Sequence, residues 1–433
     1  MNIAAFPKYE SHRELSLELT DIIPDHWEVW KISHAFEKVG SGTTPDTGRV
    51  AYYEGDISWL QTGDLTDGDV GITNKTISPL ALREYPTLKV YPVGSLVMAM
   101  YGATIGKLGK LKIPTATNQA CCVFVESHVV TSDFAFYSFL AMRPYILSDA
   151  YGGGQPNISQ QTIKTLKIIV PPHSEQRAIA AFLDGKCATI DEAARIKEEQ
   201  IKLLRERRQI LIQQAVTRGL NPDAPMKDSG IDWIGKIPAH WGVRRGKYLF
   251  REVNERSESG NEELLSVSHT SGVTPRSEKN VNMFLAEDYT GSKLCRPGDI
   301  VINTMWAWMG ALGVSDLRGI ISPSYGVYRS LRAGAFNQRF LEWLLRTTPF
   351  IEQYNKISTG LHTSRLRLYP HMFLGMPMAF PNRDEQDSIV THVENEAEKI
   401  DKAISIKQEQ IAKLKEYKTS LINAAVTGKI KVI

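Results

Sequence analysis

The sequence contains little cysteine. Its four cysteines among 433 residues are Cys121, Cys122, Cys187 and Cys295, and none of them forms a Cys-x-x-Cys motif. This usage gives neither a disulfide framework nor the ligand spacing of a zinc site. We therefore expect buried free thiols and no bound metal.

Long apolar runs are also missing. No stretch approaches the roughly 20 apolar residues that a membrane-spanning helix needs. Residues 1–7 lack the basic start, apolar centre and small-residue cleavage site of a secretion signal. We therefore expect a cytoplasmic protein that does not interact with a membrane.

Recognisable catalytic motifs are absent as well. Residues 102–108 superficially resemble a phosphate-binding loop, but the segment is one residue short and Leu108 replaces the magnesium-binding Ser or Thr. The sequence has no Gly-x-Ser-x-Gly elbow and no His-Glu-x-x-His pair. Its single Pro-Pro pair precedes His173, so the Asn-Pro-Pro-Tyr stretch of an adenine methyltransferase is missing. These absences favour a binding protein that has neither an active site nor a cofactor.

The net charge of +3 argues against a generally basic, non-specific binder of polyanions. Residues 237–380 hold 17 Lys and Arg against 12 Asp and Glu, whereas residues 23–170 hold 12 against 13. The second segment could therefore bind phosphates through its overall charge, while the first needs basic groups gathered on one face. Charge alone permits a nucleic-acid partner without establishing it.

An internal repeat dominates what is present. Residues 23–27 (Ile-Pro-Asp-His-Trp) recur as residues 237–241 (Ile-Pro-Ala-His-Trp), and the pair Glu175-Gln176 recurs as Glu385-Gln386. Without gaps, residues 175–220 match residues 385–430 at 18 of 46 positions, including a closing Ala-Val-Thr. We expect the repeated tryptophans to pack against the strands that follow them.

The segments between these landmarks differ in sequence. Strand-like runs at 94–100 and 298–304 lead to Gly106 and Gly310 at the same distance, yet the intervening side chains differ almost throughout. The two copies are therefore expected to share a fold and to present different surfaces, as in a protein whose two domains recognise different ligands.

The pattern of strands, turns and helices predicts an α+β chain. We predict a lead-in of uncertain order at 1–22, a mixed, mostly β domain at 23–170, a helical region at 171–222, a second mixed domain at 223–380 and a C-terminal helical region at 381–433. Strand-like runs include 56–61 and 120–125. Within the first domain, a helix over 133–142 should stop before Pro144. Gly185 should mark a break between a short and a long helix.

Both helical regions carry an apolar stripe at three- and four-residue steps. The proposed seam consists of Ile190, Ala194, Ile201, Leu204 and Leu211 in the first region and Ile400, Ile404, Ile411, Leu414 and Leu421 in the second. Each helix could pack on the core of its own domain. We favour packing of the two helices on each other, antiparallel, as an intramolecular coiled coil with a seam of roughly 40 Å.

Together these features resemble a known family. The two Ile-Pro-x-His-Trp openings, residues 102–107, 118–120 and 154–159, and the Glu-Gln helices that close in Ala-Val-Thr are similar to the DNA-specificity subunit of Type I restriction-modification systems. The similarity extends from about residue 20 to near the end of the chain. The second copy departs from the pattern at 307–311 and 323–326, so its target cannot be inferred from that of the first copy.

The resemblance implies a non-catalytic, sequence-specific DNA-binding subunit. In that family two target recognition domains each read half of a bipartite, asymmetric site on double-stranded DNA. The helices set the spacer and dock two methyltransferase subunits, to which restriction subunits with nuclease and translocase activity attach. Adenine methylation with S-adenosylmethionine, and ATP- and Mg-dependent cleavage, belong to those partners.

Candidate DNA contacts are loop-borne polar, basic and aromatic side chains. In the first domain they are Thr43, Thr44, Gln61, Thr62, Tyr101, Thr104, Lys107 and Asn118. In the second domain they are Arg256, His269, Thr270, Trp306, Arg365 and Arg367.

Two other functions compete with this interpretation. A self-contained nuclease or methyltransferase would need motifs that the sequence lacks. A two-domain coiled-coil scaffold that binds ligands other than nucleic acid would need none of them. Specific binding to duplex DNA that falls steeply with salt would favour the specificity subunit over the scaffold.

Overall fold

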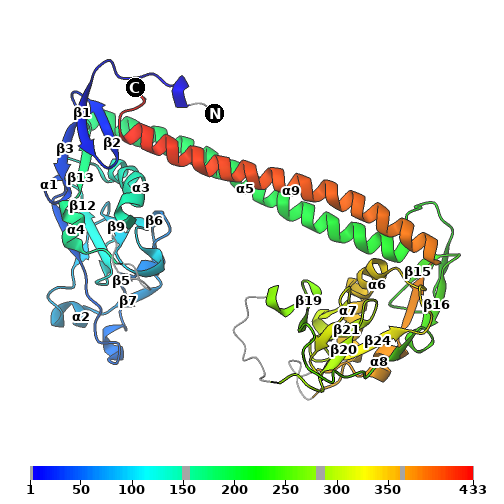
Figure 1. The fold of residues 1–433 in the computed structure, drawn as a ribbon. Coiled ribbons are helices and arrows are strands. Elements are labelled where there is room, and N and C mark those ends of the chain that lie inside the picture. Colours follow the sequence, from blue (N-terminus) through cyan, green and yellow to red (C-terminus); the bar gives the residue numbers. More distant parts are fainter. Residues whose placement is uncertain (1–2, 149–156, 279–287, 361–365, 433) are drawn as a thin grey trace. The chain divides into compact units, whose positions relative to one another are not determined.

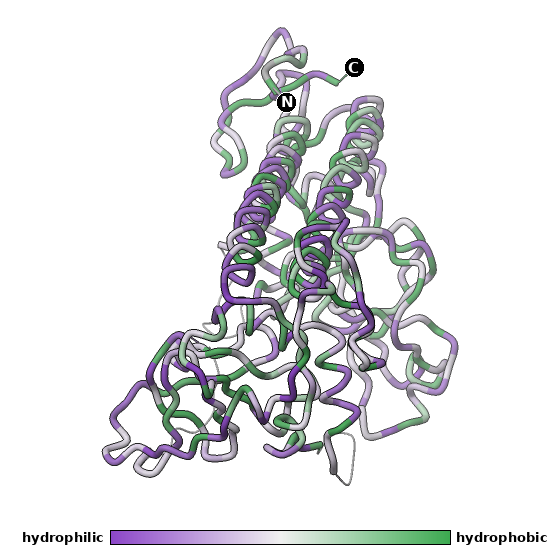
Figure 2. Tube along the Cα trace, turned by 90° about the vertical axis from the view of Figure 1, so that its right-hand side faces the viewer, coloured by the Kyte–Doolittle hydropathy of each residue, from purple (hydrophilic) through white to green (hydrophobic). Residues whose placement is uncertain are grey.

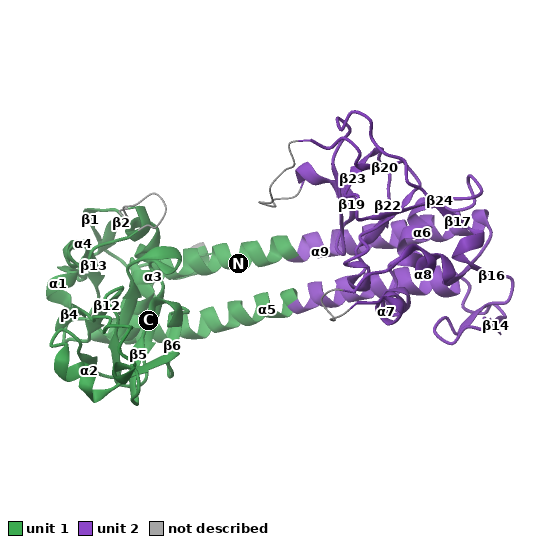
Figure 3. Cartoon of the chain, turned by 90° about the horizontal axis from the view of Figure 1, so that it is seen from below, with its two compact units in different colours: residues 1–198, 408–433 green, residues 199–407 purple. Residues whose placement is uncertain are grey.

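The computed structural model describes residues 3–148, 157–278, 288–360 and 366–432 (Figure 1). The chain is α+β and divides into two compact units (Figure 3). Unit 1 contains residues 1–198 and 408–433, and unit 2 contains residues 199–407. Each unit therefore combines one copy of the repeat with the end of the helix that belongs to the other copy.

Unit 1 contains two larger sheets and two strand pairs. The pairs are β1 (His12–Leu17) with β2 (Thr20–Pro24) and β3 (Glu28–Lys31) with β13 (Lys167–Val170). A five-stranded sheet has the order β4 (Lys38–Ser41), β12 (Cys121–Val125), β9 (Leu96–Ala99), β10 (Leu108–Leu111) and β6 (Gly68–Val70). A four-stranded sheet has the order β7 (Lys75–Ile77), β5 (Ile57–Leu60), β11 (Thr115–Thr117) and β8 (Val90–Tyr91). The residues predicted as a lead-in of uncertain order, 1–22, thus include β1 and the start of β2.

The helices of unit 1 are α1 (Ile32–Ala35), α2 (Pro79–Glu84), α3 (Ser132–Ser148), α4 (Gln160–Thr165) and the first part of α5 (His173–Arg218). Short 3-10 turns are η1 (Ile3–Ala5), η2 (Val50–Tyr52), η3 (Thr62–Asp64) and η4 (Gly102–Thr104). Ser78 caps α2 by accepting a hydrogen bond from the Ala81 amide, and Pro79 occupies the first turn, where its missing N–H costs nothing.

Unit 2 contains one four-stranded sheet and several strand pairs. The sheet has the order β17 (Phe250–Glu252), β24 (Gly326–Ser330), β21 (Ile300–Ile302) and β22 (Leu312–Val314). The pairs are β14 (Met226–Asp228) with β15 (Lys236–Pro238), β16 (Gly242–Arg245) with β25 (Pro377–Phe380), β18 (Leu265–Ser268) with β19 (Gly272–Pro275) and β20 (Lys293–Cys295) with β23 (Gly319–Ile321).

The helices of unit 2 are α6 (Gln338–Leu345), α7 (Thr348–Ile357), α8 (Pro370–Gly375) and the first part of α9 (Arg383–Val426). Its 3-10 turns are η5 (Gly246–Tyr248), η6 (Arg276–Glu278) and η7 (Ala307–Met309). Asn337 caps α6, because its side-chain oxygen accepts hydrogen bonds from the Arg339 and Phe340 amides at 2.9 and 3.3 Å.

A common frame underlies both units. The order β4-β12-β9-β10 in unit 1 corresponds to β17-β24-β21-β22 in unit 2, and all neighbouring pairs in these series are antiparallel. The strands predicted at 56–61, 94–100, 120–125 and 298–304 are confirmed as β5, β9, β12 and β21. What differs is the added structure, which is the β7-β5-β11-β8 sheet in unit 1 and the β18-β19 and β20-β23 pairs in unit 2.

Two predicted helix boundaries are wrong. Helix α3 continues through Pro144 to Ser148, and α5 continues through Gly185 without a break. Pro144 removes one hydrogen bond of the helix, but the neighbouring Arg143 anchors this turn to the Gly106 carbonyl at 2.9 Å. Gly185 is exposed, and buried Leu183 and Cys187 on either side hold the helix against the core. Tertiary contacts therefore outweigh the local cost of these residues.

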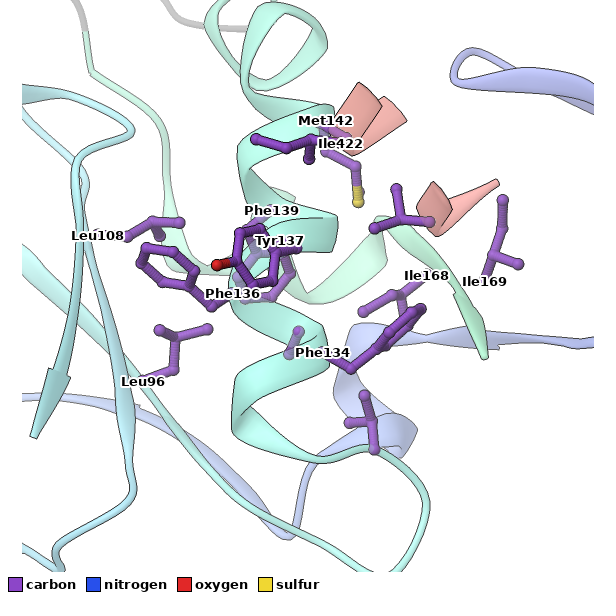
Figure 4. Packing of buried hydrophobic residues seen from close by; sticks show 14 of the residues in the cluster. Leu96, Leu108, Phe134, Phe136, Tyr137, Phe139, Met142, Ile168, Ile169 and Ile422 are labelled. Carbon is purple, nitrogen blue, oxygen red and sulfur yellow. The ribbon is translucent and has the colours of Figure 1, made fainter. Parts of the chain in front are cut away.

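Each hydrophobic core is completed by the end of a helix from the other copy of the repeat. The core of unit 1 surrounds α3 and includes Ile422, Ala425 and Val426 of α9 (Figure 4). The core of unit 2 correspondingly includes Ala215 and Val216 of α5. This burial explains why the repeated Ala-Val-Thr segment is apolar so close to the end of a highly charged helix. In Figure 2, hydrophobic and hydrophilic residues alternate along the helices, as expected of amphipathic segments.

Candidate nucleic-acid interface

The repeated His-Trp and Glu residues contact each other in unit 1. The Trp27 indole N–H donates a hydrogen bond to Glu175 Oε2 at 3.0 Å, and Tyr9 donates to the same oxygen at 2.7 Å. His26 Nε2 lies 2.6 Å from Glu175 Oε1. Partial burial disfavours the charged carboxylate, but these hydrogen bonds hold the pKa of Glu175 below its usual range. The carboxylate thereby ties the first turn of α5 to the start of the domain.

The same contact recurs in unit 2. Trp241 donates to Glu385 Oε1 at 3.1 Å, and His240 Nε2 lies 2.7 Å from Glu385 Oε2. Both indoles are buried, as predicted, but the sequence analysis missed their hydrogen bonds to a residue about 145 positions away. The recurrence of His-Trp and Glu at matching positions was the signal that could have revealed the pair.

The repeated glutamines form a second link between helix and domain. Gln176 is fully buried, donates to the Val129 and Pro171 carbonyls at 2.9 Å each, and accepts from the Thr131 amide at 2.8 Å. Gln386 repeats this arrangement with Ala335, Pro381 and Asn337. The Glu-Gln motif therefore fixes each long helix to the opening of its domain and to the segment before α3 or α6.

Polar contacts join α5 and α9 within each unit. In unit 1, Lys418 Nζ lies 2.7 Å from an Asp191 carboxylate oxygen, and Lys197 donates to Gln410 at 2.8 Å. In unit 2, Arg208 Nη1 lies 3.5 Å from Asp401 Oδ1. Within unit 1 the partner number on α9 falls as the number on α5 rises, so these segments run antiparallel.

The predicted seam residues all have restricted exposure. Ile190, Ala194, Ile201, Ile400, Ile411 and Leu421 are buried, and Leu204, Leu211, Ile404 and Leu414 are partly buried. Ile190 and Leu421 belong to the core of unit 1, against which Leu414 packs. A continuous coiled coil along the whole of both helices stays a prediction.

The structure brings together four of the predicted contacts in unit 1. The Gly42 and Thr43 amides donate to the Asn118 and Thr117 carbonyls, and the Asn118 amide donates to Leu60, directly before Gln61. Thr44 donates to Gln119 at 2.6 Å. Thr43, Thr44, Gln61 and Asn118 thus lie where the ends of β4, β5 and β11 meet. The Asn118 side chain is buried and accepts from the Ala120 amide at 3.2 Å, which limits it to a supporting role in this conformation.

Three other predicted contacts in unit 1 lie in the segments directly after β5 and β9. Thr62 opens η3, and Thr104 ends η4 between β9 and β10. Tyr101 is 42% exposed and forms a β-bridge to Asn157. Residues 102–104 of the first family-like motif thus form a 3-10 turn, while residues 154–156 of the neighbouring motif lie outside the described part of the chain.

Lys107 already has a partner. Its Nζ lies 2.8 Å from Asp67 Oδ2, and Asp67 also accepts from Arg143 and from the Leu108 amide. Burial of Asp67 opposes its ionisation, but these donors hold the pKa of its carboxyl below the usual range. Asp67 adopts a left-handed φ of 63°, which this set of hydrogen bonds stabilises. Binding of a phosphate by Lys107 would have to compete with this ion pair.

In unit 2, two predicted contacts lie close to one another. Trp306 is 51% exposed and stacks with Trp308 at a centroid distance of 6.4 Å. Arg367 is exposed and contacts the Met305 sulfur at 3.9 Å. The Leu368 amide donates to the Thr304 carbonyl at 2.9 Å, which joins the segment before η7 to the segment before α8. An exposed aromatic and an exposed guanidinium are therefore neighbours here.

The remaining predicted contacts in unit 2 are spread more widely. His269 and Thr270 are exposed in the β18-β19 turn, where their carbonyls accept from Arg346 at 2.6 and 2.9 Å. Arg256 is exposed and donates to the Gly291 carbonyl at 2.7 Å. Arg365 lies outside the described residues.

Two of the exposed aromatics were not predicted as contacts. Tyr369 is 44% exposed and stacks on His371 only two residues from Arg367, and Tyr248 lies 64% exposed with the Lys247 ammonium 5.0 Å from its ring centre. A sequence pattern cannot separate an exposed tyrosine from a buried one in a short turn, so no local signal marked these residues.

The thiols fit a structural role. All four cysteines are buried and free, as predicted. Burial raises the pKa of Cys122 to about 12 and that of Cys187 to about 11, which suppresses the nucleophilic thiolate. Among the described residues, no group of three or more His, Cys, Asp or Glu side chains could hold a metal ion. No helix in the described ranges combines the length and apolarity required to cross a membrane.

The sequence of this chain is similar to those of known restriction-modification proteins. A family model described as the Type I restriction modification DNA specificity domain matches residues 24–202. The MjaVIII Type I restriction enzyme specificity subunit of Methanocaldococcus jannaschii is 25% identical over 95% of this chain and 94% of its own length. This chain is therefore similar to Type I restriction-modification specificity subunits over nearly its whole length. The MjaIX specificity subunit of the same organism is 30% identical over 44% of each chain.

Two solved structures share the fold of this chain. The HsdS subunit from Thermoanaerobacter tengcongensis is 16% identical, with a TM-score of 0.54 over 94% of this chain and 98% of its own. A chain from a study of complex assembly and conformational transition of the Type I R-M system has a TM-score of 0.67 at 16% identity, over 94% of this chain and 99% of its own. The shared fold therefore extends over both copies of the repeat, including the second copy, which the family model does not match.

Proposed function

We propose that this chain directs a Type I restriction-modification complex to its DNA target by reading a bipartite, asymmetric site. One observation carries the proposal. Two units have the same β frame and the same Glu-Gln anchoring of a long helix, but carry different added strands and loops. A constant frame with variable loops is what independent readers of two different half-sites require.

The side chains available for this reading differ between the units. In unit 1 the polar residues Thr43, Thr44 and Gln61 lie at one meeting point of strand ends, next to Gln119, which accepts from Thr44. Such side chains can bond to base edges and phosphates. In unit 2, exposed Trp306 and Arg367 combine an aromatic face with a phosphate-binding cation.

The long helices suit the parts of the complex that do not depend on sequence. We propose that α5 and α9 set the length of the spacer between the half-sites and dock two methyltransferase subunits, to which restriction subunits attach. In this arrangement S-adenosylmethionine, ATP and Mg²⁺ act in the partner subunits, and this chain recognises the target sequence on the DNA.

Domain exchange combined with methylome sequencing tests this proposal. Residues 237–380 are replaced by the corresponding segment of another family member, while Glu385 and Gln386 are retained to anchor the helix. Cells carrying the chimera and its methyltransferase should methylate a site in which one half has changed and the other half and the spacer length are preserved. Exchange of residues 23–170 is the matched control and should change the other half. Changes in both halves after a single exchange would contradict independent reading.

A further inference from the structure

A second repeated feature lies where a helix of each domain meets α5 and α9. In unit 1, a pocket of about 380 Å³ is lined by residues of α3, α5 and α9. In unit 2, a pocket of about 600 Å³ is lined by residues of α6, α9 and α5. Neither pocket contains a residue that we assign to DNA reading.

The two pockets correspond residue by residue. Gln176 and Gln386 bond to the Thr131 and Asn337 amides, so α3 aligns with α6 and Tyr137 matches Trp343. The helix repeat matches Asp184 with Glu394, Asp191 with Asp401, Lys418 with Arg208 and Ile422 with Ile212. The two domains differ in their recognition loops, yet they preserve the chemical type of these five positions.

Counting the described residues alone, each pocket contains a carboxylate without a cationic partner. Lys418 pairs with Asp191 and Arg208 pairs with Asp401, so these two acids are already neutralised. Asp67, which also lines the pocket of unit 1, pairs with Arg143 and Lys107. Asp184 accepts a hydrogen bond from the Tyr137 hydroxyl at 2.5 Å, and no cation among the described residues pairs with it.

In unit 2 the other charges in the pocket wall are also paired, Lys402 with Glu398 at 2.7 Å and Arg339 with Asp316 at 3.7 Å. Within the described part of the chain, Glu394 has no hydrogen-bond or ion-pair partner. Asp184 and Glu394 are both exposed.

This combination favours a basic ligand. A carboxylate beside an aromatic wall attracts a guanidinium or ammonium group through both charge and the ring face. A repeated pocket in two otherwise different units also suits a partner that binds twice, because two copies of one protein need two equivalent surfaces. DNA is a poor occupant, since the unpaired charges are negative.

We infer that each pocket receives an arginine or lysine side chain from one of the two methyltransferase subunits, so that both copies dock in the same way. The inference rests on the proposed function, which requires two such subunits. It adds the position of the contact on each unit and the chemistry that the partner must present.

Charge reversal within the complete complex tests the inference. Asp184→Lys and Glu394→Lys are prepared singly and together, co-expressed with the methyltransferase, and examined by native mass spectrometry and by titration of the partner. Each single variant should retain one methyltransferase and bind the second at least tenfold more weakly than wild type. The double variant should bind both copies weakly.

Matched controls separate charge from folding. Glu416→Lys and Glu206→Lys alter exposed, equivalent acids of the same helices outside the pockets and should leave two subunits bound. The neutral variants Asp184→Asn and Glu394→Asn should weaken binding less than the lysine variants, with thermal unfolding midpoints close to wild type. Binding of two subunits by the double lysine variant with wild-type affinity would overturn the inference. A wild-type chain that binds no methyltransferase would instead contradict the proposed function.

Discussion

The Trp27 indole donates a hydrogen bond to the Glu175 carboxylate across 148 positions of sequence, and Trp241 donates in the same way to Glu385. Trp27 is 1% exposed, so its N–H cannot turn to water when the carboxylate is removed. The contact therefore couples the fold of each domain to the start of its long helix.

Truncation of this carboxylate should destabilise its unit. We expect Glu175→Ala to lower the free energy of unfolding by about 1–3 kcal/mol, because a buried donor loses its partner. Urea denaturation measures the change, and hydrogen exchange should locate it in unit 1. Glu28→Ala is the control, because Trp30 and Glu28 form an exposed indole–carboxylate pair that water can replace. Equal effects of the two variants would contradict a special role for the buried contact.

The same carboxylate should make stability depend on pH in the acid range. The pKa of Glu175 is lowered in the folded protein, so its contribution is fully present above the ordinary value of about 4.3 and is lost as pH falls through the folded value. Between pH 7 and pH 3, wild type should lose more stability than Glu175→Gln, which has no proton to take up at this position. Parallel pH profiles of unfolding free energy for the two proteins would show that the depressed pKa contributes nothing.

The repeated frame could be predicted because short sequence patterns mark its elements and the same patterns occur in both copies. Apolar runs marked β9 and β21, and Glu-Gln marked the starts of α5 and α9. Pro144 misled the prediction of the end of α3, because the contact of Arg143 with Gly106 is invisible in the local sequence.

The candidate site was harder to predict than the frame. Lys107 was predicted to contact DNA, whereas Asp67, forty positions earlier, holds it in an ion pair. Residue type alone does not reveal which basic side chains a fold has already neutralised. In contrast, the predicted contacts Trp306 and Arg367 are both exposed and lie close together, although Tyr369 beside them was overlooked.

Arg367 should contribute to DNA binding through charge. If its guanidinium neutralises one phosphate, Arg367→Ala should reduce the slope of log affinity against log salt concentration by about 0.9. Fluorescence anisotropy of a target duplex bound by the methyltransferase complex, measured across a salt series, provides this slope. Arg49→Ala is the matched control, because Arg49 already pairs with Glu84 at 2.8 Å and should leave the slope unchanged. An unaltered slope for Arg367→Ala would remove this residue from the interface.

Lengthening both helices should lengthen the spacer. Four residues inserted after Lys202 and four after Ala412, which are equivalent positions of the repeat, add about 6 Å to each helix. At about 3.4 Å per base pair, the methylated site should keep both half-sites and gain one or two base pairs between them. Insertion into α5 alone is the control and should disturb the pairing of the helices without producing a defined new spacer. An unchanged spacer after the double insertion would contradict the role of the helices in setting it.

Two glycines that end the long helices should respond unequally to the same substitution. Gly219 and Gly428 both have a left-handed φ, of +74° and +72°, so alanine at either position is strained by about 1 kcal/mol. An added Cβ at Gly428 would lie 2.3 Å from the Pro24 Cδ atom, whereas at Gly219 the nearest atom is Glu385 Oε1 at 3.3 Å, which needs to move by only a few tenths of an ångström. Gly428→Ala should therefore destabilise unit 1 by roughly 2–3 kcal/mol, and Gly219→Ala should destabilise unit 2 by only about 1 kcal/mol. Urea unfolding measures the change in unfolding free energy, and hydrogen exchange shows which unit is affected. A larger loss of stability for Gly219→Ala than for Gly428→Ala would show that Pro24 moves aside for the new Cβ at residue 428 more easily than the 2.3 Å distance indicates.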